Sequence, residues 1–577
     1  MQNSCRLFSL PYLKFSFEVG GNELIGSREE RLGRLRSNPD ARVLIVGGGI
    51  NGISTLRELA LQGVDVTLIE KKDFTSGASA ASSHMVHGGV RYLENGEFRL
   101  VKESLQERNR LLKNAPHLVK PLRTTIPIFS VFSGILSAPL RFLTHSSGKP
   151  KERGAFLIKV GLILYDTFGR AGKSMPKHQF WGKKKSLKNF PDMNQDVKFT
   201  ASYFDASMES PERLAIEVLS DAVSHSNANA VNYVSLIGKS AGGVLLKDEL
   251  SGEEFEFKAD LVINATGPWT DMTNALLGES TKYMGGTKGS HIVVDNPRLL
   301  EACDGREIFF ENNDGRIVLM YPLLGRVLIG TTDIKVDMGE EIYCTEEEID
   351  YFIDLVKLVY PSIEVNRDQI VYKYSGVRPL PAADDLAPGF VSRDYRIELT
   401  KPMSSEFGLL SLVGGKWTTF RALGEHLADE AMKLTGDQRK LTTTDMPIGG
   451  GLNYPKTDSE VASWLKTNSS GISTDRAKQL LERYGTKAAE LIAQIAVNGE
   501  SMVSDHYSDV ELKYLVETEG VSQLADLIYR RTNIGFVGGF DSDQLQQIAD
   551  LVAKSLGWEK SETKAQIESI ELDKVLA

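Results

Sequence analysis

A glycine-rich run that precedes an acidic residue is the strongest chemical signal in the sequence. Apolar residues 43–46 predict a buried strand that leads into a GxGxxG pattern at 47–52. In this pattern the first glycine allows a tight turn, the second lets backbone approach a pyrophosphate, and the third lets a helix pack against the strand. A second predicted strand, 64–69, ends at Glu70, whose carboxylate can accept a hydrogen bond from a ribose hydroxyl. The spacing therefore predicts a dinucleotide site at the amino end of a helix.

Two further junctions between an apolar strand and glycine indicate which dinucleotide binds. Strand 261–263 runs into Asn-Ala-Thr-Gly, strand 409–413 runs into Gly-Gly-Lys, and a segment dense in small residues follows at 75–89. Three junctions far apart in the sequence favour one extended cofactor, FAD, over NAD. The predicted cofactor-binding residues are Gly47, Gly49, Gly52, Glu70, Ser82, Ser83, His87, Gly88, Gly89, Ala265, Thr266, Gly267, Gly415, Lys416 and Thr418.

The motifs of the chain resemble those of the FAD-dependent, quinone-linked glycerol-3-phosphate dehydrogenase family of the respiratory chain. The matching stretches are GGGING at 47–52, SSHMVHGGVRYLENGEFRLV at 82–101, NATGPW at 264–269, KGSHIVV at 288–294, IGTTD at 329–333, YSGVRPL at 374–380, SRDY at 392–395, GGKWTTFRALGEH at 414–426, ELKYLV at 511–516 and YRRTNIGF at 529–536. The resemblance implies oxidation of sn-glycerol 3-phosphate to dihydroxyacetone phosphate. Hydride would pass from C2 to flavin N5, and the electrons would pass on to a quinone.

Cationic and titratable residues in these motifs are the candidates for substrate chemistry. Arginine suits a phosphate dianion because its planar fork bonds bidentately and stays protonated. The resemblance implies that the substrate-binding residues are Arg91, Tyr92, Thr332, Arg378, Arg393 and Lys416. Arg378 and Lys416 are also predicted to be catalytic, with His87 as the base because histidine titrates near neutrality. His291 is a second candidate base, and Asp333 is either a substrate-orienting residue or an ordinary cap.

Composition and charge exclude several other classes of protein. The net charge of −10 argues against a nucleic-acid partner. Three cysteines, with no CxxC pair, argue against a disulfide scaffold and fit a reducing compartment. The nine histidines form no HxH or HxxxH pair, so no metal site is predicted. The sequence also contains neither a P-loop nor a GxSxG elbow.

Periodicity divides the chain into three parts. Residues 1–40 match no motif and are predicted to be a flexible extension; a short amphipathic helix within 28–42 and a mitochondrial presequence are the alternatives. Residues 41–440 are predicted to be an α/β oxidoreductase region. Its Rossmann-type FAD-binding segments, at about 41–115, 200–275 and 405–435, alternate with an antiparallel-sheet substrate domain that has a hairpin turn at 313–315. Helical periodicity then predicts a separate helical domain over 441–577.

One segment has the composition of a membrane-surface contact. Residues 141–188 are rich in Lys and Arg, and the apolar stretch within them, 155–165, is too short to span a bilayer. This pattern favours peripheral contact with an anionic leaflet, the alternative being a buried helix beside a solvated basic loop. The expected location is the cytoplasmic face of the inner membrane or the cytoplasm, with the mitochondrial inner membrane as the alternative. A homodimer is possible.

Three functions stay open at this point. The first is the quinone-linked dehydrogenase, and the second is a glycerol-3-phosphate oxidase that reduces oxygen to hydrogen peroxide. The third is a non-catalytic flavoprotein that acts as a binding module. The cationic residues in the predicted substrate motifs argue against the third, because a scaffold needs no phosphate receptors beside its flavin.

Overall fold

A largely parallel sheet forms the nucleotide-binding half of the protein. The computed structural model describes residues 25–90, 97–131, 155–169, 175–312, 316–382, 394–402 and 406–576. The strands of this sheet are, in spatial order, β17 (Arg396–Lys401), β18 (Gly408–Val413), β10 (Glu254–Asn264), β1 (Asp40–Val46), β2 (Val66–Glu70) and β7 (Ala228–Asn232), with the hairpin β8 (Val234–Ser240) and β9 (Gly243–Asp248) attached to β10. Val46 pairs with Asn264, and Asn264 with Ser411, in parallel register. Since parallel strands share their carboxyl edge, the three glycine junctions lie side by side.

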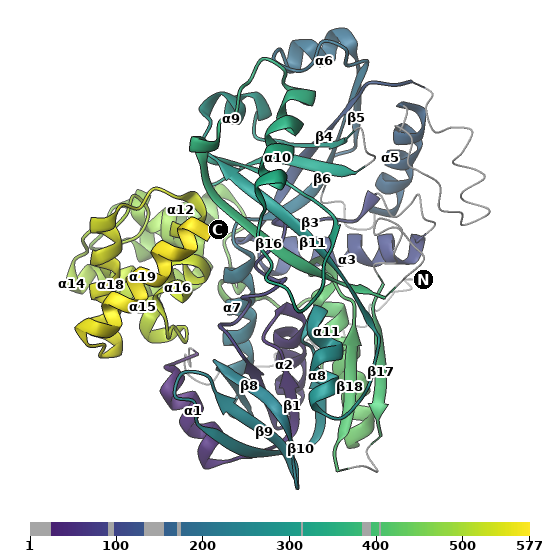
Figure 1. Ribbon diagram of the computed structural model, residues 1–577. Helices are drawn as coiled ribbons and strands as arrows, with labels where there is room; N and C mark the ends of the chain where they lie inside the picture. Colours follow the sequence, from purple (N-terminus) through teal and green to yellow (C-terminus); the bar gives the residue numbers. More distant parts are fainter. Residues whose placement is uncertain are drawn as a thin grey trace, which may run out of the picture.

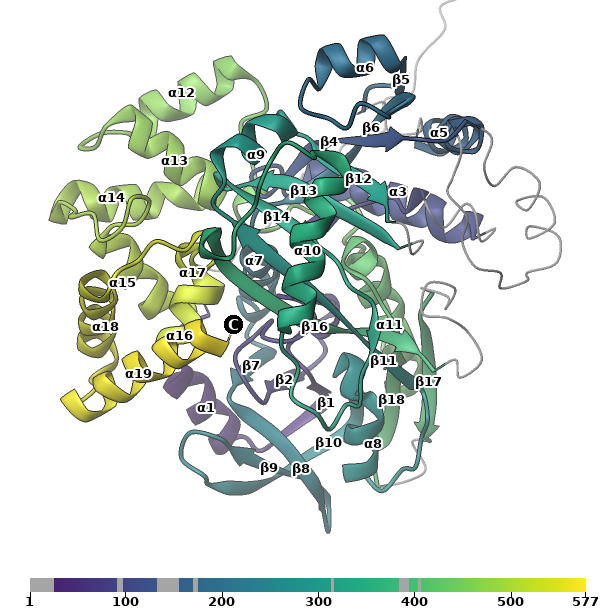
Figure 2. The same ribbon diagram turned by 45° about the horizontal axis from the view of Figure 1, so that its top comes forward.

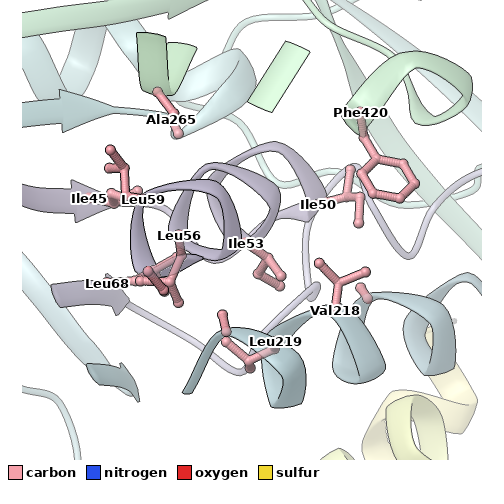
Figure 3. Close-up of a cluster of buried hydrophobic side chains, with 14 of the residues drawn as sticks. Ile45, Ile50, Ile53, Leu56, Leu59, Leu68, Val218, Leu219, Ala265 and Phe420 are labelled. Atoms are coloured by element: carbon pink, nitrogen blue, oxygen red, sulfur yellow. The ribbon is translucent and has the colours of Figure 1, made fainter. Parts of the chain in front are cut away.

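Helix α2 (Ile50–Gln62) is the centre of the core in this half. It packs between the sheet and the helices α7 (Pro211–Val223) and α11 (Phe420–Thr435). Figure 3 shows its side chains Ile53 and Leu56 facing α7 and β2. The apolar positions at 50, 53, 56 and 59 follow the helical period and are buried, so this helix is fixed directly after the glycine turn.

The second sheet is mainly antiparallel. Its strands are, in order, β15 (Ile334–Lys335), β11 (Met284–Val294), β14 (Arg326–Gly330), β13 (Ile317–Leu323), β12 (Glu307–Glu311), β4 (Val119–Ile128), β6 (Phe199–Met208) and β3 (Met85–Val86), with β16 (Ile370–Pro381) paired to β11 and β5 (Gln179–Gly182) to β6. Helices α9 (Pro297–Cys303) and α10 (Glu346–Val359) pack against β11–β14 through a shared apolar core. The predicted turn at 313–315 lies outside the described residues, but it joins β12 and β13, which are antiparallel.

A group of helices follows the two sheets, and Figures 1 and 2 show it packed on one side of the molecule. Its main helices are α12 (Asp458–Asn468), α13 (Thr474–Tyr484), α14 (Ala488–Asn498), α15 (Asp509–Thr518), α16 (Leu524–Asp526), α17 (Ile534–Val537), α18 (Ser542–Leu556) and α19 (Lys560–Leu576). They share a core of their own. Arg531 joins them to the nucleotide-binding half, because its two terminal nitrogens each lie 2.9 Å from a carboxylate oxygen of the buried Asp73. Burial alone would raise the pKa of Asp73, but the charges of Arg531 and Arg530 lower it to about 2.

The predicted fold class is therefore confirmed: an α/β protein with a Rossmann-type half, an antiparallel-sheet half and C-terminal helices. The remaining helices that bear on the site are α1 (Arg28–Ser37), α3 (Phe98–Asn114), α5 (Ala155–Gly169), α6 (Lys183–Asn189) and α8 (Thr270–Leu276). Among the described residues, no helix is long and apolar enough to cross a bilayer.

Helix α1 occupies part of the predicted N-terminal extension. A capping box between Ser27 and Glu30 starts it, and its Leu32 and Leu35 are buried against the hairpin β8–β9 and its neighbours. Arg28 donates to the carbonyl of Asn232 at 3.0 Å. Residues 28–37 therefore form the short amphipathic helix that was one of the alternatives for this stretch, and this helix packs against the sheet.

Candidate active site

The first glycine junction folds as a tight turn whose geometry only small residues allow. Gly47 has φ +113°, and a Cβ there would lie 2.7 Å from the carbonyl oxygen of Ala265. A Cβ at Gly52 would lie 2.0 Å from the carbonyl oxygen of Gly47. The amide of Gly48 donates to Oε2 of Glu70 at 2.7 Å, so the turn and the end of β2 are bonded together. Burial raises the pKa of Glu70.

The other two junctions meet this turn. Gly415 has φ +112°, and a Cβ there would lie 2.5 Å from the side-chain nitrogen of Asn51, at the start of α2. The side-chain oxygen Oδ1 of Asn51 is buried and has no hydrogen-bond partner among the described residues. Thr266 donates through its hydroxyl to Oδ1 of Asn264 at 2.7 Å, which holds the second junction against the sheet. Glycine turns, a helix N-terminus and an unsatisfied amide oxygen therefore converge in one place, where the sequence predicts the FAD site.

A buried polar network holds the loop that contains His87. The amide of Gly88 donates to Oδ1 of Asp205 and to the hydroxyl of Tyr165, each at 3.0 Å. Asp205 also accepts from Tyr165 at 2.7 Å and from Arg108 at 2.9 Å. A Cβ at Gly88 would lie 2.4 Å from Cδ2 of Leu105, so a larger residue would displace this loop.

The same loop contacts the third junction and the second sheet. The hydroxyl of Thr418 donates to the carbonyl of His87 at 3.1 Å, and Lys416 donates to Oγ of Ser104 at 2.9 Å. Tyr374 donates to the carbonyl of Ser82 at 2.7 Å. The predicted cofactor loop thus lies between the two sheets.

Arg378 projects from β16 over a place in the second sheet where side chains are missing, here called the gap. The gap consists of Gly289 and Gly376, whose backbones pair across β11 and β16. A Cβ at Gly289 would lie 2.2 Å from Nη2 of Arg378, and a Cβ at Gly376 would lie 2.3 Å from Cβ of Ala81 in the cofactor loop. The two glycines therefore bring the arginine and the cofactor loop to neighbouring positions on one face of the sheet.

Arg378 rests on the turn that follows β14. Its Nη1 donates to Oδ1 of Asp333 at 3.0 Å, and its Nη2 donates to the hydroxyl of Thr331 and the carbonyl of Thr332, each at 2.9 Å. Asp333 is therefore an ion-pair partner of Arg378, and not an ordinary cap. The hydroxyl of Thr332, predicted to bind substrate, is buried and donates to Glu348 at 2.6 Å; only the carbonyl of Thr332 meets Arg378.

His291 lies on the same face of the sheet, opposite Tyr374. The two rings stack with centroids 4.8 Å apart and planes 13° from parallel. Nε2 of His291 lies 2.8 Å from Oγ of Ser83, whereas its Nδ1 is buried and has no hydrogen-bond partner among the described residues. Burial and then the charge of Arg378 lower the pKa of His291 well below its ordinary value, so the ring is neutral at pH 7. His87 is half-buried.

The structure brings most predicted site residues into two adjacent groups. The cofactor group surrounds the three glycine junctions, and the substrate group consists of Arg378, Asp333 and the turn at 331–332, with His291 beside them. Arg91, Tyr92 and Arg393 lie outside the described residues, so their roles stay predictions. No cluster of metal-ligating side chains occurs in the described part of the chain.

Several supporting residues were not predicted from the sequence. They are Gly289, Gly330, Glu348, Tyr374, Asp205 and Tyr165. A Cβ at Gly330 would lie 2.1 Å from the ring of His291, so both glycines leave room for a functional side chain. Gly289 and Gly330 lie within the motifs KGSHIVV and IGTTD, so the sequence contained a signal by which these two glycines could have been predicted. Glu348 lies in a run of three glutamates that is typical of an exposed helix start, so no signal marks it.

Comparisons with known proteins agree with this architecture. The family model of FAD dependent oxidoreductases matches residues 42–430, and the model of the C-terminal domain of alpha-glycerophosphate oxidase matches residues 441–563. A glycerol-3-phosphate dehydrogenase of Synechocystis sp. is 33% identical over 552 residues, which cover 91% of this chain and 95% of the relative. A D-erythritol 1-phosphate dehydrogenase of Brucella abortus is 31% identical over 500 residues, covering 85% of this chain and 93% of the relative.

The fold is also similar to a solved structure, that of the glycerol-3-phosphate dehydrogenase from Bacillus halodurans in complex with FAD. The TM-score is 0.73 at 23% sequence identity, and the match covers 96% of this chain and 98% of the other. The overall fold is therefore shared with that structure. The chain belongs to the FAD-dependent glycerol-3-phosphate dehydrogenase family, with FAD as its cofactor.

Proposed function

We propose that this flavoenzyme oxidises sn-glycerol 3-phosphate to dihydroxyacetone phosphate and passes the electrons to a quinone. The observation that carries the proposal is the gap at Gly289 and Gly376, where Arg378 and the cofactor loop meet on one face of the sheet. A fixed cation next to a flavin loop suits a substrate that has an anionic end and a C–H bond to be oxidised.

The side chains around this gap have different roles in substrate binding. Arg378 supplies the positive charge that attracts the phosphate, because a guanidinium remains protonated at neutral pH. Asp333 and the turn at 331–332 hold the guanidinium in place. Lys416, at the third glycine junction, adds a second positive charge, and Arg91, Tyr92 and Arg393 complete the proposed substrate site.

Bound FAD supplies the hydride acceptor, its N5 atom, for the hydrogen on C2 of the substrate. The hydroxyl proton on the same carbon must leave to a base as the ketone forms. His87 and His291 are the two candidates for this base. The buried Nδ1 of His291, which has no hydrogen-bond partner among the described residues, supports His291, and the position of His87 in the cofactor loop supports His87.

Anaerobic mixing with glycerol 3-phosphate tests the proposal directly. We expect the flavin absorbance to bleach, and glycerol at the same concentration to leave it unchanged. D-erythritol 1-phosphate should be tested alongside, because a relative at 31% identity carries that name. A flavin that stays oxidised with both phosphates would favour the non-catalytic flavoprotein.

The electron acceptor is tested separately. The C-terminal domain has the family description of an oxidase, which is the reason to consider oxygen as the alternative acceptor. We expect the reduced protein to be reoxidised faster by a ubiquinone analogue than by dissolved oxygen. If dissolved oxygen instead reoxidises the protein faster than the ubiquinone analogue does, with stoichiometric formation of hydrogen peroxide, the oxidase is favoured.

We also propose that the substrate half contacts an anionic membrane surface. On α5 the exposed side chains Phe156 and Ile163, at 57% and 48%, lie on one face with Val160 and Leu164, whereas Leu162 is buried. The exposed lysines 183–185 begin α6, and Figures 1 and 2 place α5 and α6 at the same end of the molecule, beyond the second sheet. An apolar helix face beside lysines suits a peripheral site on an inner-membrane leaflet, bacterial or mitochondrial.

A further inference from the structure

We propose that Glu348 is a positioning residue of the substrate site, because its buried carboxylate holds the turn on which Arg378 rests. The inference depends on the proposed role of Arg378 as the phosphate receptor. Glu348 lies in the first turn of α10 and is 3% exposed. It therefore acts through its neighbours and not by contact with solvent or substrate.

Four donors converge on this single carboxylate. They are Nζ of Lys288 at 2.7 Å, the hydroxyl of Thr332 at 2.6 Å, the hydroxyl of Ser290 at 2.8 Å and the amide of Thr345 at 2.9 Å. Lys288 and Ser290 belong to β11, Thr332 to the turn after β14, and Thr345 caps α10. One carboxylate thus joins a strand, a turn and a helix beneath the site.

Two of these donors also contact Arg378, through other atoms. Thr332 donates to Glu348 through its hydroxyl and accepts from Nη2 of Arg378 through its carbonyl, at 2.9 Å. Lys288 donates to Glu348 through Nζ, and its carbonyl lies 3.4 Å from Nη1 of Arg378. Ser290 bonds Ser375 on β16 at 2.6 Å, close along the strand to the arginine. A shift of the carboxylate would therefore move the oxygens that aim the guanidinium.

The charge of Glu348 is part of this arrangement. Burial alone would raise the pKa of the carboxyl, but the bonds from Lys288, Thr332, Thr345 and Ser290 lower the pKa below its ordinary value. The group is therefore ionised at neutral pH and balances the buried ammonium of Lys288. A glutamine at 348 keeps the shape but leaves that ammonium without its counter-ion beside Arg378.

The experiment compares Glu348→Gln with Glu347→Gln, its exposed neighbour in the same helical turn. Stopped-flow reduction of the flavin at increasing glycerol 3-phosphate, without oxygen, separates the substrate Kd from the limiting rate. We expect Glu348→Gln to raise Kd at least about tenfold with normal FAD content, since small misplacement of a binding group is costly. Glu347→Gln should match the unmodified protein. The double variant Glu348→Gln/Arg378→Ala should be no weaker than Arg378→Ala alone, because both changes act on one interaction.

Each alternative outcome decides the matter. If Arg378→Ala weakens binding and Glu348→Gln does not, the inference about Glu348 is wrong and the phosphate site stands. If Arg378→Ala binds normally, the proposed phosphate site is wrong and this inference falls with it. Additive losses in the double variant would also overturn the inference. If Glu348→Gln does not fold, Thr332→Val removes one hydroxyl of the same network, and an unchanged Kd for that variant would overturn it.

Discussion

In the nucleotide-binding half, each glycine junction is a short stretch of chain whose turn depends on its own glycines, whereas in the substrate half each predicted site residue is held by residues far apart in the sequence. Gly47 and Gly52 contact each other within a single turn. Arg378, by contrast, depends on Asp333 and on the turn at 331–332, and His291 depends on Ser83. The first half is therefore controlled by local backbone sterics, and the second by the register of long-range strand pairs.

The largest effect is expected at the local turn. Gly52→Val should give protein without bound FAD, because a Cβ at 52 would lie 2.0 Å from the carbonyl oxygen of Gly47. The ratio of flavin to protein absorbance after purification measures this loss. Gly33→Ala is the control, since a Cβ at 33 meets no atom within 4 Å, and it should keep its FAD. Full FAD content in Gly52→Val would show that the turn does not carry the cofactor.

Arg378→Ala should separate the two halves, because we expect it to weaken substrate turnover without changing FAD binding. A hydrogen bond to a charged group contributes about 1.5–3 kcal/mol, and Arg378→Ala also leaves Asp333 without its ion-pair partner, so kcat/KM should fall by about 100-fold or more. Arg378→Lys should lose less, since lysine keeps the charge but not the fork. FAD content should be unchanged in both variants.

The control for Arg378 is the exposed Arg396 on β17, which pairs with Glu398. Arg396→Ala should keep the kcat/KM of the unmodified protein for glycerol 3-phosphate. If Arg378→Ala behaves in the same way, the arginine has a structural role and the phosphate site lies elsewhere.

A smaller effect is expected at the proposed membrane face. Each lysine near an anionic surface contributes about 1 kcal/mol, so replacing lysines 183–185 with glutamine should weaken binding to acidic vesicles by up to about 100-fold at low salt. Vesicle sedimentation at several salt concentrations measures this, and salt should weaken binding of the unmodified protein. Replacing Lys433, Lys478 and Lys513, which are exposed on helices of the other two regions, is the matched control. Equal loss in both triple variants would mean that general charge, and not this face, drives binding.

The smallest effect concerns the pH dependence of the stability of the protein, through a histidine in the segment that joins the two halves. His84 is buried with φ +54°, and burial lowers its pKa from 6.5 to about 4. In the unfolded chain, His84 becomes protonated below pH 6.5, whereas in the folded protein it becomes protonated only below about pH 4. This group's contribution to stability is thus present above pH 6.5 and is lost as pH falls, at about 1.4 kcal/mol per unit.

His84→Asn removes this titration and tolerates the left-handed backbone better than most residues. Between pH 7 and pH 5 its Tm should fall less than that of the unmodified protein, even if the variant is less stable at pH 7. Parallel Tm curves for the two proteins would show that His84 does not titrate in this range.

Prediction from the sequence succeeded where the structure of a short segment is determined by the residues of that segment alone. The strand, glycine turn, helix and acid at 43–70 were expected because tight turns need glycine and helix packing needs a small third residue. Arg378 and Lys416 were proposed as site residues only through the family resemblance, since a single arginine in a strand carries no signal of its own. Glu348 was missed because three consecutive glutamates suit any helix start, and its partner Lys288 lies 60 residues away.

The sequence alone determined the cofactor class, the order of α/β and helical parts and the positions of the three glycine junctions, because these follow from local sterics and periodicity. Only the tertiary structure decided that Gly289 and Gly376 pair to make the gap for Arg378, and that His291 stacks on Tyr374. The physical reason is the register between β11 and β16. It is set by the packing of the whole sheet, and a shift of one residue would move each of these side chains to the other face.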